Sequence, residues 1–235
     1  MRIKTILFDL DGTLLPMDND EFTKGYFKLL ASKLAGFGYD PKSLVDGVWA
    51  GTAAMVRNDG GVTNEEAFWK KFESIYGEKC VKDRPLFDEF YIKEFQNARS
   101  FCGFNSDAKD IVDFAKAKGF QVVLSTNPLF PSVATESRIN WAGLEPNDFL
   151  LYTTYENSRF CKPNLNYYTE ITKKINCNPN ECLVVGNDVD EDMIASTLGM
   201  KVFLLSDCLI NKSGKDISNY PNGGFAELKS YIEQL

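Results

Sequence analysis

The sequence predicts an α/β protein whose doubly wound parallel sheet carries a second, helical domain. Short apolar runs recur along the 235 residues, with helical patterns between them. The runs are continuously apolar rather than alternating, which is typical of parallel strands covered on both faces. The alternation of strand and helix breaks once, over residues 16–99, where no convincing strand occurs. A connection of that length is far longer than a crossover helix needs, so we expect an inserted domain there.

Five apolar runs are the candidate strands of the sheet. Each is rich in apolar and β-branched residues and is bounded by turn-forming residues. They are IKTILFDL (Ile3–Leu10), FQVVLST (Phe120–Thr126), FLLYTTY (Phe149–Tyr155), ECLVVGN (Glu181–Asn187) and KVFLLS (Lys201–Ser206).

Four helical segments separate these strands after the insert. Glycine follows three of them directly, as expected just past a helix end. The segments are Ser106–Lys118, Pro131–Ala142, Leu165–Asn176 and Asp190–Leu198.

The insert has the signals of a small helical domain. Phe22 and Tyr26 begin an aromatic and apolar stripe at helical spacing, which we interpret as the core of this domain. Asp40 before Pro41 is a helix start, and Thr63 with Glu66 forms a capping box for the next helix. Leu86, Phe87, Phe90, Tyr91 and Phe95 indicate a fourth helix.

These patterns divide the chain into two parts. We expect residues 1–15 and 100–235 to form the α/β core and residues 16–99 the helical domain. The hinges between them should lie near residues 15–17 and 97–103.

Composition narrows the chemistry. The absence of histidine excludes serine–histidine and cysteine–histidine catalysis and histidine-ligated zinc. The six cysteines include no Cys-x-x-Cys pair, so we expect reduced thiols. A net charge of −7 argues against nucleic-acid and anionic-membrane partners. No apolar run has the length of a signal-peptide core or a membrane span, and we expect a cytoplasmic protein.

The first strand ends in two acids, within ILFDLDGTLL (Ile6–Leu15). A buried carboxylate is costly unless it is paired, hydrogen-bonded or bound to a metal, and Asp9 and Asp11 also repel each other. In sheets of this kind, ligands bind beyond the carboxyl ends of the strands. The other strand ends supply further polar residues that one site can collect: Ser125, Thr126, Asn127, Lys162, Asn187, Asp188, Asp190, Glu191 and Asp192.

These motifs resemble the haloacid dehalogenase superfamily of phosphohydrolases. DLDGTL, a Ser or Thr closing the second strand, Lys162 before Pro163, and an acidic loop after the fourth strand occur in the order that family shows. The helical insert directly after the first motif resembles the alpha-helical cap of relatives such as phosphoglycolate phosphatase and beta-phosphoglucomutase. The resemblance covers the whole chain and implies a Rossmann-like core with an inserted cap.

The resemblance also implies catalytic roles. Asp9 would attack phosphorus and form an aspartyl-phosphate intermediate. Asp11 would protonate the leaving oxygen and then activate water. Thr126 would donate its hydroxyl to phosphoryl oxygens, and Lys162 would balance the negative charge. Around them, we expect three residues to bind the substrate: Gly12, Thr13 and Asn127.

A magnesium ion would explain how these acids coexist, since Mg²⁺ prefers carboxylate and carbonyl oxygens. By resemblance, its ligands are the Asp9 carboxylate, the Asp11 main-chain carbonyl and an acid of the fourth motif. Asp188 and Asp192 are the candidates in that motif. With Asp188 as the ligand, Asp192 would hold a metal-bound water or orient Lys162.

Two assignments stay open at this stage. Only one of Ser125 and Thr126 can face the site because side chains alternate along a strand, and the resemblance favours Thr126, which precedes an asparagine. The fourth motif departs from the usual Gly-Asp, since Asn187 and then Asp188 follow Gly186. Either Asp188 is the metal ligand or Asn187 binds through its amide oxygen, and negative charge favours Asp188.

The expected function is a Mg²⁺-dependent phosphatase that acts on a small phosphorylated metabolite, with the protein as a monomer. An acid at Asp11 supports hydrolysis of the phosphoenzyme, whereas dehalogenases of the superfamily lack it. The alternatives are a phosphomutase resembling beta-phosphoglucomutase and a non-catalytic phosphate-binding module. Specificity should reside in the cap, where Arg57 either meets a distal anionic group or is an ordinary surface arginine.

Overall fold

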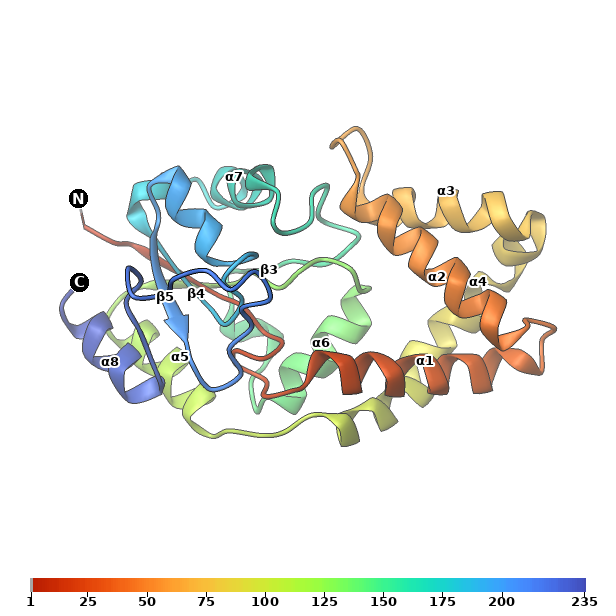
Figure 1. The fold of residues 1–235 in the computed structure, drawn as a ribbon, viewed down its shortest axis with the longest axis horizontal. Coiled ribbons are helices and arrows are strands. Elements are labelled where there is room, and N and C mark those ends of the chain that lie inside the picture. The colour runs from red at the N-terminus through yellow and green to blue at the C-terminus, as the bar shows by residue number, and fades with distance from the viewer. Residues whose placement is uncertain (1) are drawn as a thin grey trace.

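The computed structural model describes residues 2–235 and confirms the α/β fold with a helical cap inserted after the first strand (Figure 1). All strand pairs in the sheet are parallel, and their order is β3-β2-β1-β4-β5-β6. The first strand therefore lies in the middle, between the strands that carry the second and fourth motifs. The strands are β1 (Thr5–Phe8), β2 (Gln121–Leu124), β3 (Leu151–Tyr152), β4 (Cys182–Gly186), β5 (Lys201–Leu205) and β6 (Asn222–Gly223).

Helices cover both faces of this sheet. Alternate residues of β1 face opposite sides, so Ile6 and Phe8 pack with α5 and α8, while Leu7 packs with α7 and η4. The core helices are α5 (Asp107–Ala117), α6 (Ser132–Trp141), α7 (Leu165–Lys174) and α8 (Phe225–Glu233), with 3₁₀ turns η2 (Pro146–Asp148), η3 (Pro179–Glu181) and η4 (Met193–Leu198).

The structure differs from the sequence prediction in three elements. β6 and α8 were not expected, although Phe225, Leu228 and Ile232 are buried at helical spacing. The helix expected over residues 190–198 is a turn followed by the 3₁₀ segment η4. The Asp188 carboxylate accepts the backbone N–H groups of Asp190 and Glu191, which open this turn.

The cap is helical throughout. The Thr63–Glu66 capping box and the Asp40 N-cap are formed as predicted. The fourth helix begins at Glu78, more than one turn before Leu86, the first of the apolar residues that predicted this helix. The cap elements are α1 (Asn19–Ala35), α2 (Pro41–Val56), α3 (Asn64–Tyr76), α4 (Glu78–Ile92) and the 3₁₀ segment η1 (Glu94–Phe101).

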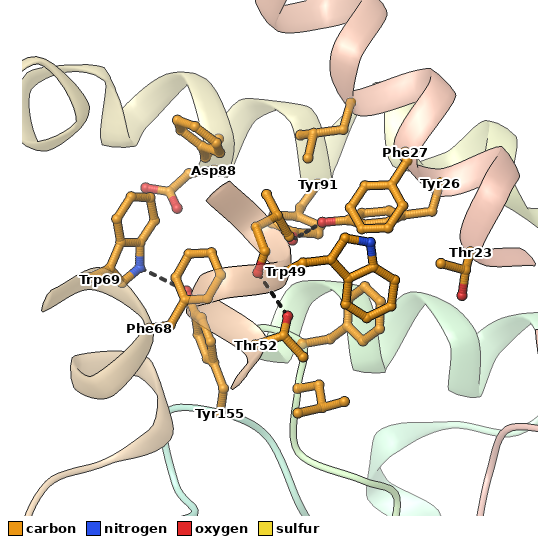
Figure 2. A pocket seen from close by; sticks show the side chains of 15 residues that line it. Thr23, Tyr26, Phe27, Trp49, Thr52, Phe68, Trp69, Asp88, Tyr91 and Tyr155 are labelled. Atoms are coloured by element: carbon orange, nitrogen blue, oxygen red, sulfur yellow. Dashed lines mark hydrogen bonds between the residues drawn. The ribbon is translucent and has the colours of Figure 1, made fainter. Parts of the chain in front are cut away.

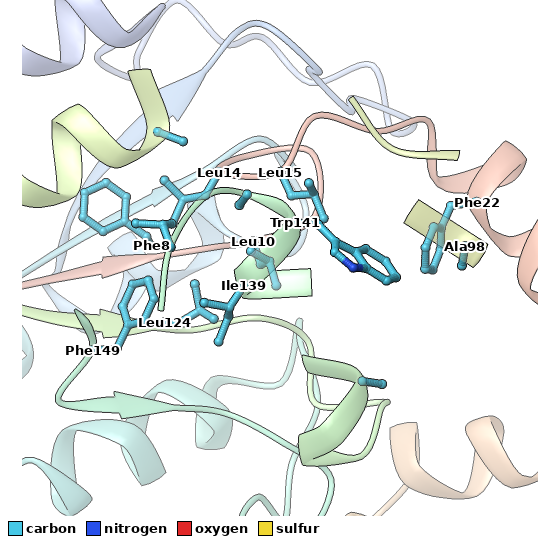
Figure 3. Packing of buried hydrophobic residues seen from close by; sticks show 14 of the residues in the cluster. Phe8, Leu10, Leu14, Leu15, Phe22, Ala98, Leu124, Ile139, Trp141 and Phe149 are labelled. Carbon is cyan, nitrogen blue, oxygen red and sulfur yellow. The ribbon is translucent and has the colours of Figure 1, made fainter. Parts of the chain in front are cut away.

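The two crossings between cap and core lie side by side. Met17 and Cys102 form an isolated antiparallel bridge, and the Gly103 N–H donates to the Pro16 carbonyl at 2.7 Å. One hydrophobic cluster continues from the sheet through Trp141 of α6 to the base of the cap (Figure 3). Among residues 2–235, no helix is long and apolar enough to cross a membrane.

Candidate active site

Residues that directly follow three parallel strands line one cavity of about 240 Å³ at the carboxyl edge of the sheet. Asp9 and Asp11 follow β1, Thr126 follows β2, and Asn187 follows β4. Helix α1 of the cap closes the cavity with Phe22 and other side chains. The wall also includes Asn127, Asp188, Glu191, Asp192, Leu129, Phe130, Met17, Asn19, Thr23, Ile210 and Lys212.

Lys162 joins two acids beneath the cavity. Its Nζ lies 2.9 Å from Asp9 Oδ1 and 2.6 Å from Asp192 Oδ1, and all three side chains are buried. Burial by itself lowers the pKa of Lys162, but Asp192 and Asp9 outweigh it and raise that pKa well above its ordinary value, so the lysine keeps its charge. The other oxygen of Asp192 accepts the Asp188 N–H at 3.0 Å. The Asp192 carboxylate is therefore engaged on both sides and orients Lys162.

Thr13 connects Asp9 to Asn187. The Thr13 hydroxyl lies 3.0 Å from Asp9 Oδ2 and 3.0 Å from Asn187 Oδ1. Asn187 Nδ2 donates to the Cys208 carbonyl at 2.7 Å, which leaves the amide oxygen to face the Thr13 hydroxyl. Gly12 makes this approach possible, since its φ is +83° and a Cβ there would lie 2.3 Å from Asn187 Nδ2.

Arg138 of α6 is the site residue that the sequence reasoning missed. Its side chain is 1% exposed and its guanidinium pairs with Asp11 Oδ2 while stacking 4.5 Å from the centre of the Phe130 ring. Asp11 Oδ1 is buried and has no hydrogen-bond partner among the described residues. The sequence offers only a weak signal, a charged residue close to Ile139 and Trp141 on a helix that also carries several polar residues.

The fourth-motif loop is organised around Asp188. Asp188 Oδ1 accepts the N–H groups of Asp190 and Glu191 at 2.8 and 2.9 Å, so this oxygen caps the turn. Glu191 lines the cavity and accepts a hydrogen bond from Asn127 Nδ2 at 3.0 Å. Burial raises the pKa of Glu191 to about 7.

The carboxylates outnumber the cations in the cavity. Five carboxyl groups line it, and burial, with Asp192 and Asp11 nearby, raises the pKa of Asp9 to about 7 although Lys162 opposes the shift. Within residues 2–235, no three Asp, Glu, Cys or His side chains converge closely enough to hold a metal ion by themselves. The single Thr13 proton can serve only one of its two acceptors, so either Asp9 or Asn187 keeps an oxygen free. These carboxylate and amide oxygens suit a hard cation.

Two further candidates from the sequence, Ser125 and Arg57, do not line the catalytic cavity. Ser125 Oγ donates to the Phe8 carbonyl at 3.3 Å inside the sheet, whereas Thr126 lines the cavity. Arg57 is exposed at the end of α2 and lines neither this cavity nor the smaller aromatic one in the cap.

The sequence profile of haloacid dehalogenase-like hydrolases matches residues 3–196, which include every side chain described at this site except Cys208, Ile210 and Lys212. The chain belongs to this family. It is therefore a hydrolase, with the cap placed directly after the first motif.

Two characterised relatives match most of the chain. The ribulose-1,5-bisphosphate 5-phosphatase of Halopiger xanaduensis is 22% identical over 204 residues, covering 85% of this chain and 83% of its own. The glyceraldehyde 3-phosphate phosphatase of Methanothermobacter thermautotrophicus is 21% identical over 227 residues, covering 92% of this chain and 94% of its own.

Solved structures share the fold at low identity. A 2-haloacid dehalogenase from Pseudomonas syringae superposes with a TM-score of 0.63 at 18% identity, covering 99% of both chains. A hydrolase of the family from Bacillus subtilis, solved with bound magnesium, gives 0.55 at 16% identity and 99% coverage of both chains.

Proposed function

We propose that this hydrolase is a Mg²⁺-dependent phosphatase that cleaves small phosphate monoesters through a phosphorylated Asp9. The observation that supports it best is the placement of two acids with different surroundings. Asp9 is held between Lys162 and Thr13. Asp11, two residues later in the sequence, lines the same cavity, and its buried Oδ1 has no hydrogen-bond partner among the described residues. The curated relatives, both phosphatases of phosphorylated sugars, support the same reaction class.

The first half-reaction transfers the phosphoryl group to the protein. A carboxylate oxygen of Asp9 attacks phosphorus in line as the bond from phosphorus to the ester oxygen breaks. Protonated Asp11 gives its proton to the departing oxygen, so the alcohol leaves neutral. Lys162, charged and fixed by Asp192, neutralises the charge that gathers around Asp9, and the Thr126 hydroxyl can donate to a phosphoryl oxygen.

The second half-reaction frees the phosphate. Asp11, now a carboxylate, accepts a proton from water as that water attacks phosphorus and the bond to Asp9 breaks. This returns Asp9 to a carboxylate, Asp11 to its acid form, and releases inorganic phosphate. Asp11 therefore donates a proton in the first half-reaction and accepts one in the second. A non-catalytic phosphate-binding protein would not require an acid in this position.

Mg²⁺, when bound, would neutralise charge on the phosphoryl oxygens and on Asp9. The residues that would hold it are Asp9 and, by its backbone carbonyl, Asp11. For the remaining position the geometry favours Asn187, because its amide oxygen and an Asp9 oxygen share the Thr13 hydroxyl, whereas Asp188 caps a turn. This is the alternative ligand that the sequence left open.

The test of the proposed function is the Asp9→Asn variant. We expect turnover of p-nitrophenyl phosphate with Mg²⁺ to fall by at least a thousandfold, because an amide is a far weaker nucleophile than a carboxylate. Asp113→Asn, an exposed aspartate on α5, is the matched control and should keep full activity. Retained turnover in Asp9→Asn would remove the nucleophile assignment, and no turnover of any ester by the wild type would remove the function.

A further inference from the structure

We propose that the alcohol part of the substrate is a compact apolar group about the size of one ring, and that it binds in an aromatic cavity of the cap. The inference rests on the proposed phosphatase function and names the substrate class. The cap cavity has a volume of about 120 Å³ and lies among α1, α2, α3 and α4 and the core loop at Leu129 (Figure 2). Nine of its fifteen lining residues are aromatic.

The cap cavity adjoins the catalytic cavity. Thr23, Leu129 and Phe130 line both. Phe130 is also the ring on which Arg138 stacks while it pairs with Asp11. In the proposed binding mode, an ester whose phosphorus lies at Asp9 has its leaving oxygen near Asp11 and extends its organic part past Phe130 toward the cap cavity.

The polar atoms of the cap cavity are largely used by the protein itself. The hydroxyls of Tyr26 and Tyr91 bond each other at 2.9 Å, and Trp69 Nε1 donates to the Tyr155 hydroxyl at 3.5 Å. Figure 2 shows these pairs on opposite sides of the space that the rings enclose. Because these donors and acceptors are already paired, they offer little to the hydroxyl groups of a sugar, and desolvating such hydroxyls there would be unfavourable.

Charge and size point the same way. None of the fifteen lining residues is lysine or arginine, and Asp88 is the only carboxylic acid among them. A second phosphate or a carboxylate would meet that acid without a cation to balance it, so bisphosphates are poor candidates. An apolar cavity of roughly 150 Å³ can hold a benzene molecule, so one of about 120 Å³ suits a single small ring.

Trp49 allows the cavity to be altered without opening the core. Its side chain lines the cavity, contacts Phe27 with ring centres 5.3 Å apart, and is 51% exposed. Phe104 is 63% exposed, lies outside both cavities, and provides the matched control.

The experiment compares two esters with alkyl leaving groups, cyclohexyl phosphate and glycerol 1-phosphate, so that leaving-group chemistry does not decide the result. We expect the wild type to have at least a tenfold lower KM for cyclohexyl phosphate. Trp49→Ala should raise the KM for cyclohexyl phosphate by roughly tenfold and change the KM for glycerol 1-phosphate less than twofold. Only the cyclohexyl group contacts the Trp49 side chain, so only that ester loses a contact. Phe104→Ala should change neither.

Calorimetric titration with cyclohexanol separates this inference from the proposed function, because binding of the alcohol needs no turnover. Saturable binding that weakens in Trp49→Ala supports the cap cavity as the subsite. A second variant, Thr52→Phe, fills the cavity from α2 and should abolish that binding.

Two outcomes would overturn the inference: absence of cyclohexanol binding, or a lower KM for ribulose 1,5-bisphosphate than for cyclohexyl phosphate. Cyclohexanol binding without turnover of any ester would support the cavity and overturn the phosphatase.

Discussion

Arg138 determines how Asp11 is held, and its effect should depend on the leaving group. An ester of a poor leaving group needs the Asp11 proton, whereas p-nitrophenolate departs without one. In Arg138→Met the side chain keeps much of its length but loses the ion pair and the stacking on Phe130. We expect kcat for glycerol 1-phosphate to fall by at least tenfold more than kcat for p-nitrophenyl phosphate.

The exposed Arg99→Met is the control for removing an arginine and should leave both rates unchanged. Equal losses on the two esters in Arg138→Met would contradict a role through the Asp11 proton. Such a result would instead show that Arg138 supports the fold alone.

Asn187 and Asp188 can be distinguished by magnesium affinity. If the Asn187 oxygen contacts the ion, Asn187→Asp adds a negative charge directly to the site and should tighten Mg²⁺ binding by about tenfold or more. Asp188→Asn should change the Mg²⁺ affinity much less, because the Asp188 side chain caps the 188–191 turn and does not contact the ion. Calorimetric titration with MgCl₂ measures both, and a larger loss in Asp188→Asn than gain in Asn187→Asp would return the role to Asp188.

At the scale of single positions, sequence reasoning can bring residues to one place when each of them follows a strand. Asp9, Asp11, Thr126, Lys162 and Asn187 each follow a strand, and parallel strands bring their carboxyl ends to one edge, so topology alone gathers them.

Arg138 could not be placed in the same way. It lies inside a helix, and its pairing with Asp11 depends on where α6 is placed relative to the loop after β1, which no local pattern encodes. The pairing of Asn187 with Thr13 likewise depends on the space beside Gly12.

Among the elements, α3 carries a local signal that should have a measurable energetic effect. The Thr63 hydroxyl accepts the Glu66 N–H at 3.2 Å and the Glu66 carboxylate accepts the Thr63 N–H at 2.8 Å. Thr63→Ala should lower the free energy of unfolding by about 1 kcal/mol, measured by urea titration. Thr197→Ala, an exposed threonine in η4, should stay within about 0.5 kcal/mol of wild type. Equal effects of the two substitutions would show that the capping box adds nothing.

Helices and strands could be predicted where the apolar pattern in the sequence extended over several turns or residues. The cap helices have caps and apolar spacing that extend over several turns, and they were recognised. β6 contains only Asn222 and Gly223, so no apolar run marks it, and it exists because β5 offers a free edge. η4 was expected as part of an α-helix because apolar spacing over so few residues does not distinguish an α-helix from a 3₁₀ segment.

On the scale of the whole molecule, the cap contacts the core at a second place far from the chain crossings. The N–H groups of Asn64 and Glu65, at the start of α3, donate to core carbonyls of Ser158 and Tyr155 at 2.8 and 2.9 Å. Asn64 Nδ2 also lies 3.3 Å from Cys161 Sγ. We propose that the crossings at residues 16–17 and 102–103 act as the hinge and that this contact fastens the closed cap.

Cys161 reports on that contact. Its side chain is 2% exposed, and burial raises the pKa of its thiol from an ordinary 9.0 to about 12, which lowers the thiolate fraction at pH 8 by about a thousandfold. Alkylation by iodoacetamide should therefore be slow and should proceed through the opened cap, where the thiol regains its ordinary pKa. Asn64→Ala removes side-chain contacts of the closed form and should speed alkylation of Cys161 at least tenfold.

Mass spectrometry measures this rate with the half-buried Cys208 as an internal reference and the exposed Asn97→Ala as the control. Raising the pH from 7 to 9 should accelerate alkylation of Cys161 in both the wild type and Asn64→Ala. The thiolate that reacts belongs to the open form, in which the thiol has a pKa near 9. A Cys161 rate equal to that of Cys208 in the wild type, or unchanged by Asn64→Ala, would mean that the start of α3 does not hold the cap closed.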